Sequence, residues 1–479
     1  MKTKKTMHLL LWLLLLQISL SSSSHYIPPD NYLIDCGSPS DSTVDGRSFF
    51  ADPHRTTVTV RPPSSKIFAR NQRPSSDLPQ IYHTARIFTY PSSYAFEIRR
   101  KGTHMVRLHF FPFEGDYNLS SAVFSVHALG FSLLNEFSVA ARSLVVKEYL
   151  VDVKSDRLVL CFVPSMGSYL AFVNAIEVVS MPDSLVPEIV HMDGRLNYDN
   201  FLSNQALEIV HRINMGGPKI TPLNDSLCRT WIPDDGYLKT VSSAESKYFG
   251  GPIVYHMTLS NEIAPGRVYR SAQVLRANEG SNITWVFPVD LGYKYFVRFH
   301  FCDIVSLALN QLHFNVYING WCAYKELDLS NVTNGFLAYP FYSDFIVEPN
   351  ARKELRISVG ALDGNMVEKN ALLNGLEIWK LNNSMASLDG EPSSSFTAMD
   401  GSGMKMGAAI EFFGAIVLIM LAIFPLVVIL VKRMKARRQI GWTRLAIDGE
   451  KINLRSRISS PNREGDRMSL INNQIFEVP

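Results

Sequence analysis

Two short stretches of alternating apolar and polar residues, one in each half of the chain, resemble each other. Residues 106–110 read Val-Arg-Leu-His-Phe and residues 297–301 read Val-Arg-Phe-His-Phe. In an extended strand, successive side chains point to opposite faces, so the apolar residues share one face and the Arg and His residues the other. The pattern predicts two equivalent, half-buried strands with a polar outer face.

Four further pairs of segments match in the same order along the chain. Residues 124–128 match 314–318, and each run continues to a turn glycine, Gly130 or Gly320. The other matches are 158–162 with 355–359, 171–178 with 371–378, and 34–37 with 213–216. Five matches in order indicate a duplication, with one domain at 30–182, a linker at 183–204 and a second domain at 205–382.

The segments between these strands carry the residues of tight turns, and helical periodicity is almost absent. Gly, Pro, Asn, Asp and Ser separate short alternating runs throughout residues 30–382. Such spacing is typical of antiparallel sandwiches and jelly rolls. We therefore predict an all-β fold made of two tandem β-sandwiches.

Two apolar segments outside these domains predict a membrane topology. Three lysines precede the leucine-rich run 9–16 and the serines 21–24, the pattern of a signal peptide at 1–24. Residues 412–431 are all apolar, Gly or Pro. Twenty such residues reach about 30 Å as a helix, enough to cross a bilayer. A transmembrane helix at 411–431 predicts a single-pass plasma-membrane glycoprotein with its N-terminus outside the cell.

The distribution of charge agrees with this topology. The whole chain has 47 Lys+Arg and 44 Asp+Glu, a net charge of +3, which gives no reason to expect a nucleic-acid partner. Residues 432–479, however, hold eleven basic and five acidic residues, and positive charge stays on the cytoplasmic side. We expect a flexible stalk at 383–410 and a disordered cytoplasmic tail at 432–479. The first basic residues of the tail are predicted to attract anionic lipid, although a stop-transfer signal alone explains them equally well: Lys432, Arg433, Lys435, Arg437 and Arg438.

An extracellular location makes cysteines and Asn-x-Ser/Thr motifs sites of modification. The five cysteines all precede the predicted span, and none shows the spacing of a zinc site. Cys302 and Cys322 flank two strand-like runs, and we predict that they form a disulfide. Five glycosylation motifs lie in the outer region, at Asn118, Asn224, Asn282, Asn331 and Asn382.

Several of these segments resemble a known family. The runs VRFHFCDI (297–304) and FNVYING (314–320), the closing segments FVNAIEVVSMP and LLNGLEIWKLN, and RTWIPDD (229–235) are similar to malectin-like ectodomains of plant receptor kinases. The resemblance is to the Catharanthus roseus receptor-like kinase-1-like (FERONIA/THESEUS type) family, over residues 30–382 and the span. It implies two malectin-like β-sandwiches that sense secreted peptides and cell-wall pectin at the plasma membrane.

This resemblance also suggests where a ligand binds. In animal malectin, an aromatic-containing loop after the strand equivalent to 106–110 contacts sugar. The loop here reads Phe-Pro-Phe-Glu-Gly-Asp-Tyr, so Phe113 and Tyr117 are the ligand-binding candidates. Packing of these rings on their own domain is an equally good interpretation. The second domain has Cys-Asp-Ile at this place.

The sequence holds no catalytic motif that we can assign. Family members continue into a kinase, whereas 48 residues follow the predicted span and no HRD, DFG or VAIK motif occurs. His109 and His300 are expected to be sheet-surface histidines, and the equivalent Glu177 and Glu377 to be structural. We expect neither an enzyme nor a metal or other cofactor.

These observations predict a kinase-less cell-surface receptor-like protein. Its tandem domains would bind a secreted peptide, cell-wall carbohydrate or a partner receptor kinase, as a co-receptor or decoy in cell-wall and growth signalling. Two alternatives are a structural wall–membrane carbohydrate-binding tether and a truncated gene model of a full receptor kinase.

Overall fold

The computed structural model describes residues 26–391, apart from 53–56, 63–66, 188–189, 193–194, 198–200, 256–259, 277–281 and 362–369. Within this part of the chain, no helix is long and apolar enough to cross a membrane. The predicted signal peptide, the transmembrane helix, the tail and residues 392–410 of the predicted stalk lie outside the described residues.

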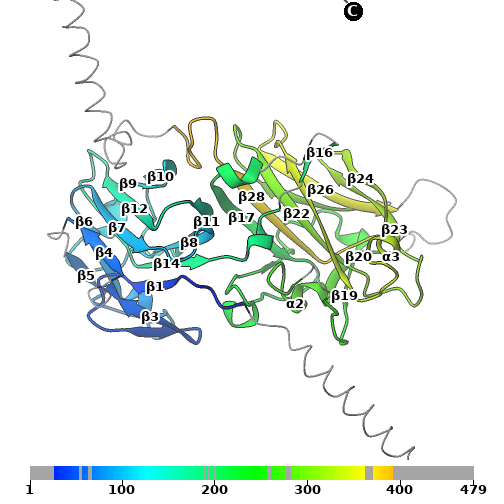
Figure 1. Cartoon of the computed structure of the whole chain (residues 1–479), viewed down its shortest axis with the longest axis horizontal. Coiled ribbons are helices and arrows are strands. Elements are labelled where there is room, and N and C mark those ends of the chain that lie inside the picture. Colours follow the sequence, from blue (N-terminus) through cyan, green and yellow to red (C-terminus); the bar gives the residue numbers. More distant parts are fainter. Residues whose placement is uncertain are drawn as a thin grey trace, which may run out of the picture. The chain divides into compact units, whose positions relative to one another are not determined.

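The described residues form an all-β structure, as predicted, with two sets of strands that follow each other along the chain (Figure 1). The helices are single turns: α2 (Gly266–Tyr269), α3 (Leu329–Val332) and 3-10 turns at Gln80–Tyr82, Leu119–Ser121, Asp183–Leu185, Phe201–Asn204, Pro222–Asn224 and Val241–Ser243.

The first set of strands forms a sandwich. One layer has the order β11 (Val145–Val153), β8 (Gly102–Phe110), β14 (Ala175–Ser180), β1 (Asn31–Asp35), β3 (Arg47–Ala51) and β2 (Ser42–Val44). The opposite layer has the order β10 (Phe131–Phe137), β9 (Phe124–Ala128), β12 (Arg157–Pro164), β7 (Ser92–Glu97) and β4 (Val58–Arg61). A small sheet adds β13 (Ala171–Val173), β6 (Thr84–Phe88) and β5 (Phe68–Arg70).

The second set repeats this arrangement. One layer has the order β25 (Pro340–Val347), β22 (Tyr295–Cys302), β28 (Gly375–Leu381) and β17 (Leu207–Asn214), with β18 (Ile232–Pro233) beside β17 and β15 (Val190–Met192) and β16 (Arg195–Asn197) beyond β25. The other layer has β21 (Asn282–Pro288), β26 (Glu354–Ala361), β23 (His313–Ile318) and β24 (Trp321–Asp328). The small sheet contains β19 (Ala244–Tyr248), β20 (Ser271–Leu275) and β27 (Leu372–Leu373).

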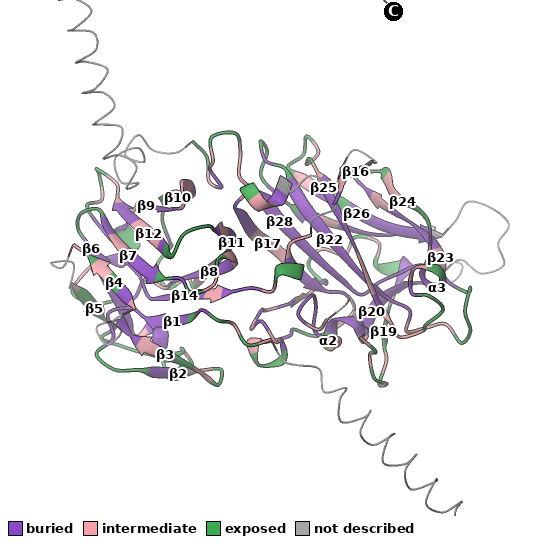
Figure 2. Cartoon of the chain, in the orientation of Figure 1, coloured by how far each residue is buried: buried purple, intermediate pink, exposed green. Residues whose placement is uncertain are grey.

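Each set of strands encloses its own hydrophobic core. The first core is rich in aromatic side chains such as Phe96, Phe110 and Phe162, and the second includes Trp285 and Phe314. The strands of both sandwiches are buried along much of their length (Figure 2). The two sets of strands thus have separate cores and share the order of their central strands.

The two sandwiches are joined edge to edge. Strand β11 of the first pairs with β17 of the second, with Tyr149 opposite Glu208 and Leu150 opposite Leu207 (Figure 1). A third apolar cluster crosses this joint and contains Met105, Phe296 and Trp379. One continuous sheet therefore runs through both halves.

The predicted closing strands differ from expectation, because each is interrupted at an asparagine. Residues 171–178 divide into β13 and β14 at Asn174, and residues 371–378 divide at Asn374 between β27 and β28. The fully buried Asn374 side chain accepts a hydrogen bond from the Cys302 backbone N–H at 2.7 Å and donates to the carbonyls of Tyr269 and Ser271. The side chain replaces the ladder bonds that the chain loses as it passes from one sheet to another.

The prediction of half-buried strands at 106–110 and 297–301 is wrong. On the supposedly polar face, Arg107 and His109 are each 5 % exposed, and Arg298 and His300 are fully buried. Small apolar clusters cover this face, one containing Phe49 and Tyr82 and the other Trp231 and Tyr269. The period-2 pattern correctly separates two faces, but both faces are inside the protein.

Candidate functional site

The loop that follows β8 adjoins a pocket of about 450 Å³ in the first sandwich. The predicted residue Phe113 lines this pocket, but only 6 % of it is exposed because it also belongs to the first core. Tyr117, the other predicted residue, is half-buried against the same core and is not part of the pocket lining. The remaining lining residues are Asn71, Arg73, Ser75, Asp77, Leu78, Phe111, Glu114 and Arg142.

Backbone contacts hold the loop in place beneath the pocket. The N–H of Arg142 donates to the carbonyl of Pro112 at 3.2 Å, and the N–H of Gln72 donates to that of Glu114 at 3.1 Å. A Cβ at Gly115 would stand 2.9 Å from the carbonyl oxygen of Arg70, closer than side chains normally approach. The loop therefore presents its residues from a fixed backbone.

The rim of the pocket carries both signs of charge. Arg142 Nη2 donates to Glu114 Oε1 at 2.6 Å, and Arg73 Nη1 lies 3.6 Å from Glu114 Oε2. The hydrogen bond and charge of Arg142, with the charge of Arg73, lower the pKa of Glu114. Both arginine side chains are largely exposed, at 74 % and 83 %. Exposed ion pairs of this kind are weak, so these side chains can turn toward a ligand at little cost.

The second sandwich lacks an aromatic residue at the corresponding position, as its sequence indicates. Asp303 there accepts hydrogen bonds from the N–H groups of Val305 and Ser306 at 3.2 and 2.9 Å. These contacts are local turn bonds. A hydrogen-bonded turn therefore occupies this place in the second sandwich.

A buried network of charged groups crosses the joint between the sandwiches. Glu148 on β11 accepts from Arg107 Nε at 2.9 Å and from Arg212 Nη2, on β17 of the second sandwich, at 2.7 Å. Arg107 Nη1 also donates to Glu177 at 2.9 Å, and Arg212 Nε donates to Glu377 at 2.7 Å. Burial alone would raise the pKa of Glu148, but the charges of Arg212 and Arg107 outweigh it and lower the pKa to about 2.

The network ends at a histidine in each sandwich. Both histidines were predicted from the sequence to lie on the sheet surface. His109 Nε2 lies 2.9 Å from Glu177 Oε1, and its Nδ1 lies 2.8 Å from the Tyr82 hydroxyl. In the second sandwich, His300 contacts Glu377 and the Tyr269 hydroxyl in the same way, at 3.2 and 2.9 Å. Burial lowers the pKa of both histidines. The expectation of surface histidines is therefore wrong, because the side chains of Phe49 and Tyr82 cover His109 and those of Trp231 and Tyr269 cover His300.

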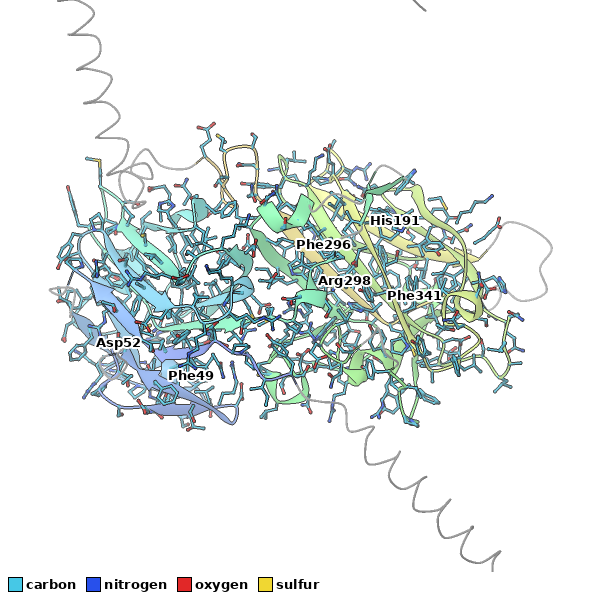
Figure 3. The ribbon with its side chains drawn as sticks, viewed as in Figure 1. Phe49, Asp52, His191, Phe296, Arg298 and Phe341 are labelled. Atoms are coloured by element: carbon cyan, nitrogen blue, oxygen red, sulfur yellow. The ribbon has the colours of Figure 1, made fainter. Side chains whose placement is uncertain are left out.

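The strand partners of these groups are equivalent in the two halves. Arg107 faces Glu148 across β8 and β11, and Arg298 faces Asp344 across β22 and β25. Arg298 binds Asp344 through two hydrogen bonds of 2.8 Å, and its guanidinium carbon lies 5.4 Å from the centre of the Phe296 ring. Figure 3 labels Arg298 and Phe296 in the second sandwich. Glu177 and Glu377 are paired with arginine in the same buried way, which supports the structural role expected for them.

A second pocket, of about 390 Å³, opens at the joint. Arg47 and Glu177 of the first sandwich form part of its wall, and Cys228 of the second faces them. The other polar and aromatic lining residues are Tyr26, Asn31, Ser48, Phe50 and Ser226. Sequence reasoning misses this pocket, because its walls come from segments about 200 residues apart.

The predicted disulfide between Cys302 and Cys322 is not formed. Both are free thiols, on β22 and β24, which belong to different sheets. Burial raises the pKa of Cys302 well above its usual range. The strand-like runs near these residues, β22 and β23, lie in different sheets and do not form a hairpin. Closeness in the sequence therefore did not predict closeness of the two thiols.

The glycosylation motifs differ in accessibility. Asn118, Asn224 and Asn331 are exposed, whereas Asn282 and Asn382 are half-buried. Among the described residues, no group of three or more His, Cys, Asp or Glu side chains is arranged to hold a metal ion.

Comparison with known proteins defines the class to which this duplicated sandwich belongs. The model of the malectin-like domain family matches residues 34–381. The chain belongs to the malectin-like family, and its relatives are receptor kinases of the Catharanthus roseus receptor-like kinase-1-like group. The resemblance stated from the sequence is therefore confirmed.

Two curated relatives from Arabidopsis thaliana illustrate the match. Receptor-like protein kinase HERK 1 is 41 % identical over 403 residues, which cover 82 % of this chain and 48 % of the relative. Receptor-like protein kinase THESEUS 1 is 41 % identical over 412 residues, which cover 84 % of this chain and 48 % of the relative. The chain thus spans about half the length of the curated relatives that it matches.

Solved ectodomain structures have the same fold. The ANX2 ectodomain from Arabidopsis thaliana superimposes with a TM-score of 0.67 at 28 % identity, covering 76 % of this chain and all of that one. A chain from the crystal structure of the plant peptide RALF23 in complex with FER and LLG2 superimposes with a TM-score of 0.67 at 30 % identity. The match covers 77 % of this chain and 99 % of that one.

Proposed function

We propose that this chain is an extracellular binding protein whose tandem malectin-like sandwiches recognise a secreted peptide at the plasma membrane. The observation that carries the proposal is the pocket beside Phe113, which combines an apolar floor with a rim of exposed charges of both signs. The relative FER occurs in a complex with the peptide RALF23 and LLG2, which supports a peptide ligand and a partner protein for this chain as well.

The chemistry of the pocket favours a peptide over a neutral sugar. Sugar sites present the flat face of an aromatic ring to a pyranose. Phe113 is almost fully buried and Phe111 is half-buried, so the pocket offers little free ring surface. Arg73, Arg142 and Glu114 are the accessible groups, and they can pair with charged side chains of a peptide.

A binding measurement with charge-reversal variants tests this proposal. The outer region would be immobilised and titrated with RALF23 in biolayer interferometry. We expect R73E/R142E to raise Kd at least about tenfold, since two charge contacts are reversed. Arg352→Glu is the matched control, because Arg352 is an exposed arginine of the second sandwich, and we expect it to leave Kd unchanged.

The outcomes separate the alternatives. An unchanged Kd in R73E/R142E would show that the peptide binds elsewhere, with the pocket at the joint as the next candidate. Binding of pectin fragments without binding of peptide would favour the wall–membrane tether. For a tether, deletion of residues 440–479 should have no effect, whereas a co-receptor that signals through its tail should lose its response.

Attachment to the membrane is part of the proposal. The span at 411–431 and the basic residues after it support a single-pass topology with attraction to anionic lipid. Co-precipitation with a full-length receptor kinase would support a co-receptor role, and sequestration of peptide without such a partner would support a decoy.

A further inference from the structure

The chain that leaves the second sandwich returns to the first. The sequence predicts a flexible stalk from residue 383 onward, but residues 383–391 lie against β10, the edge strand of a first-sandwich sheet. Leu388 is fully buried and belongs to the first core, more than 180 residues after the last strand of that sandwich. The beginning of the predicted stalk is therefore docked.

Hydrogen bonds accompany this apolar anchor. The N–H of Ser132 donates to the carbonyl of Ala386, and the N–H of Leu388 donates to the carbonyl of Ser132, both at 2.9 Å. The N–H of Asn135 donates to Asp389 Oδ2 at 3.0 Å. Residues 386–389 thus add a short parallel bridge to the open edge of β10.

The same segment remains bonded to the second sandwich. The N–H of Gly390 donates to the Tyr293 hydroxyl at 2.6 Å. Asn383 Oδ1 accepts from the N–H groups of Met385 and Ser387 at 3.0 Å each, which forms the turn that redirects the chain. The segment bridges the two sandwiches at a place separate from the β11–β17 ladder.

We propose that residues 383–391 form a latch, whose reversible docking on β10 ties the segment after β28 to the first sandwich. The latch has one apolar anchor, Leu388, and a few hydrogen bonds at a sheet edge, so it can undock without unfolding either core. In the docked state the end of the segment is bonded to both sandwiches, because Asn135 Nδ2 donates to the Glu391 carbonyl at 2.6 Å and the N–H of Gly390 donates to the Tyr293 hydroxyl. In the undocked state the bonds to β10 are broken.

Leu388 also shares a core with the candidate binding loop. Phe113, which lines the charged pocket, and Leu388 belong to the same apolar cluster. The existence of the latch does not depend on the identity of any ligand.

Hydrogen exchange on the full chain in detergent micelles tests the latch. In the unchanged protein, the amides of Ser132, Asn135 and Leu388 should exchange slowly. In Leu388→Ala, we expect these amides to exchange about 30-fold faster or more, because the anchor loses most of its buried side chain. Amides of the central strands β9 and β12 should keep their protection.

Two further variants make the result decisive. Met385→Ala is the matched control, because Met385 lies in the same segment with 44 % of its surface exposed, and it should not change the exchange. Asp389→Ala leaves the core intact and should accelerate exchange only around Asn135. Unchanged exchange in Leu388→Ala, or equal acceleration throughout the first sandwich, would overturn the proposal, since Leu388 would then be either unimportant or an ordinary core residue.

Discussion

Replacing Glu148 by Gln tests whether one carboxylate holds the two sandwiches together. Glu148 accepts hydrogen bonds from Arg107 of the first sandwich and Arg212 of the second, and only 8 % of it is exposed. A glutamine keeps the size but has no charge and turns an NH2 group toward one of the guanidinium groups. Two buried arginines would then lose their shared counter-charge.

The magnitude follows from the pKa of Glu148. Its fall from 4.5 to about 2 corresponds to about 3 kcal/mol. Removal of one partner from a buried ion pair costs about 3–5 kcal/mol in other proteins. We therefore expect the free energy of unfolding of E148Q to be about 3 kcal/mol lower at neutral pH.

The sign of the pH dependence provides a second check. Because the folded-state pKa is depressed, the stabilisation by Glu148 is complete above pH 4.5 and disappears as the pH falls toward 2. The difference between E148Q and the unchanged protein should shrink over the same interval.

Urea unfolding of the outer region, followed by the fluorescence of the buried tryptophans, measures these quantities. Glu245→Gln serves as the control, because Glu245 forms an exposed pair with Lys247 and should have no measurable effect. Equal stability of E148Q and the unchanged protein at neutral pH would refute a structural role for the network.

Three further predictions concern the cores and the surface. Asn374→Ala should lower the free energy of unfolding by at least about 3 kcal/mol, because it leaves one backbone N–H and two carbonyls without their buried partner; urea unfolding measures this. Burial lowers the pKa of His127 from 6.5 to about 4, so the stability should fall as the pH drops through this interval, and His127→Leu should remove about 3 kcal/mol of that fall in unfolding experiments at several pH values. Mass spectrometry of glycopeptides should find low occupancy at Asn382, whose side chain accepts from the Ala206 N–H and donates to the Asn383 carbonyl, and high occupancy at the exposed motifs Asn118, Asn224 and Asn331.

Local pattern was sufficient to predict the all-β class and the positions of several strands. The segments 124–128 and 314–318 lie in β9 and β23, and the glycines that follow them, Gly130 and Gly320, have positive φ values of 82° and 84°. Alternation and turn residues are properties of neighbouring positions, so they are visible in one sequence. The malectin-like resemblance depended on the same segments.

The parts that were missed depend on contacts between distant residues. Nothing in the run Val-Arg-Leu-His-Phe shows that Phe49 and Tyr82 cover its polar face. The pairing of β11 with β17 and the docking of Leu388 likewise join segments whose order in the chain gives no indication of contact. For the candidate site, the sequence pointed to the loop with Phe113 and Tyr117, and a role of these residues in binding stays a prediction. Of the two, only Phe113 lines the pocket, and the charged rim includes Arg73 and Arg142 from other loops.

The β11–β17 ladder joins two unlike edges, since β11 corresponds to β25 and β17 to β1 in the repeated strand order. A contact of this head-to-tail kind is not self-complementary, and identical units using it would assemble into a ring or an open fibre. Both terminal edges are blocked here by a hairpin that adds a parallel strand, β3 on β1 and β15 on β25. Deletion of residues 190–197 would uncover the edge of β25, and the protein would then be at risk of self-assembly into chains of sandwiches.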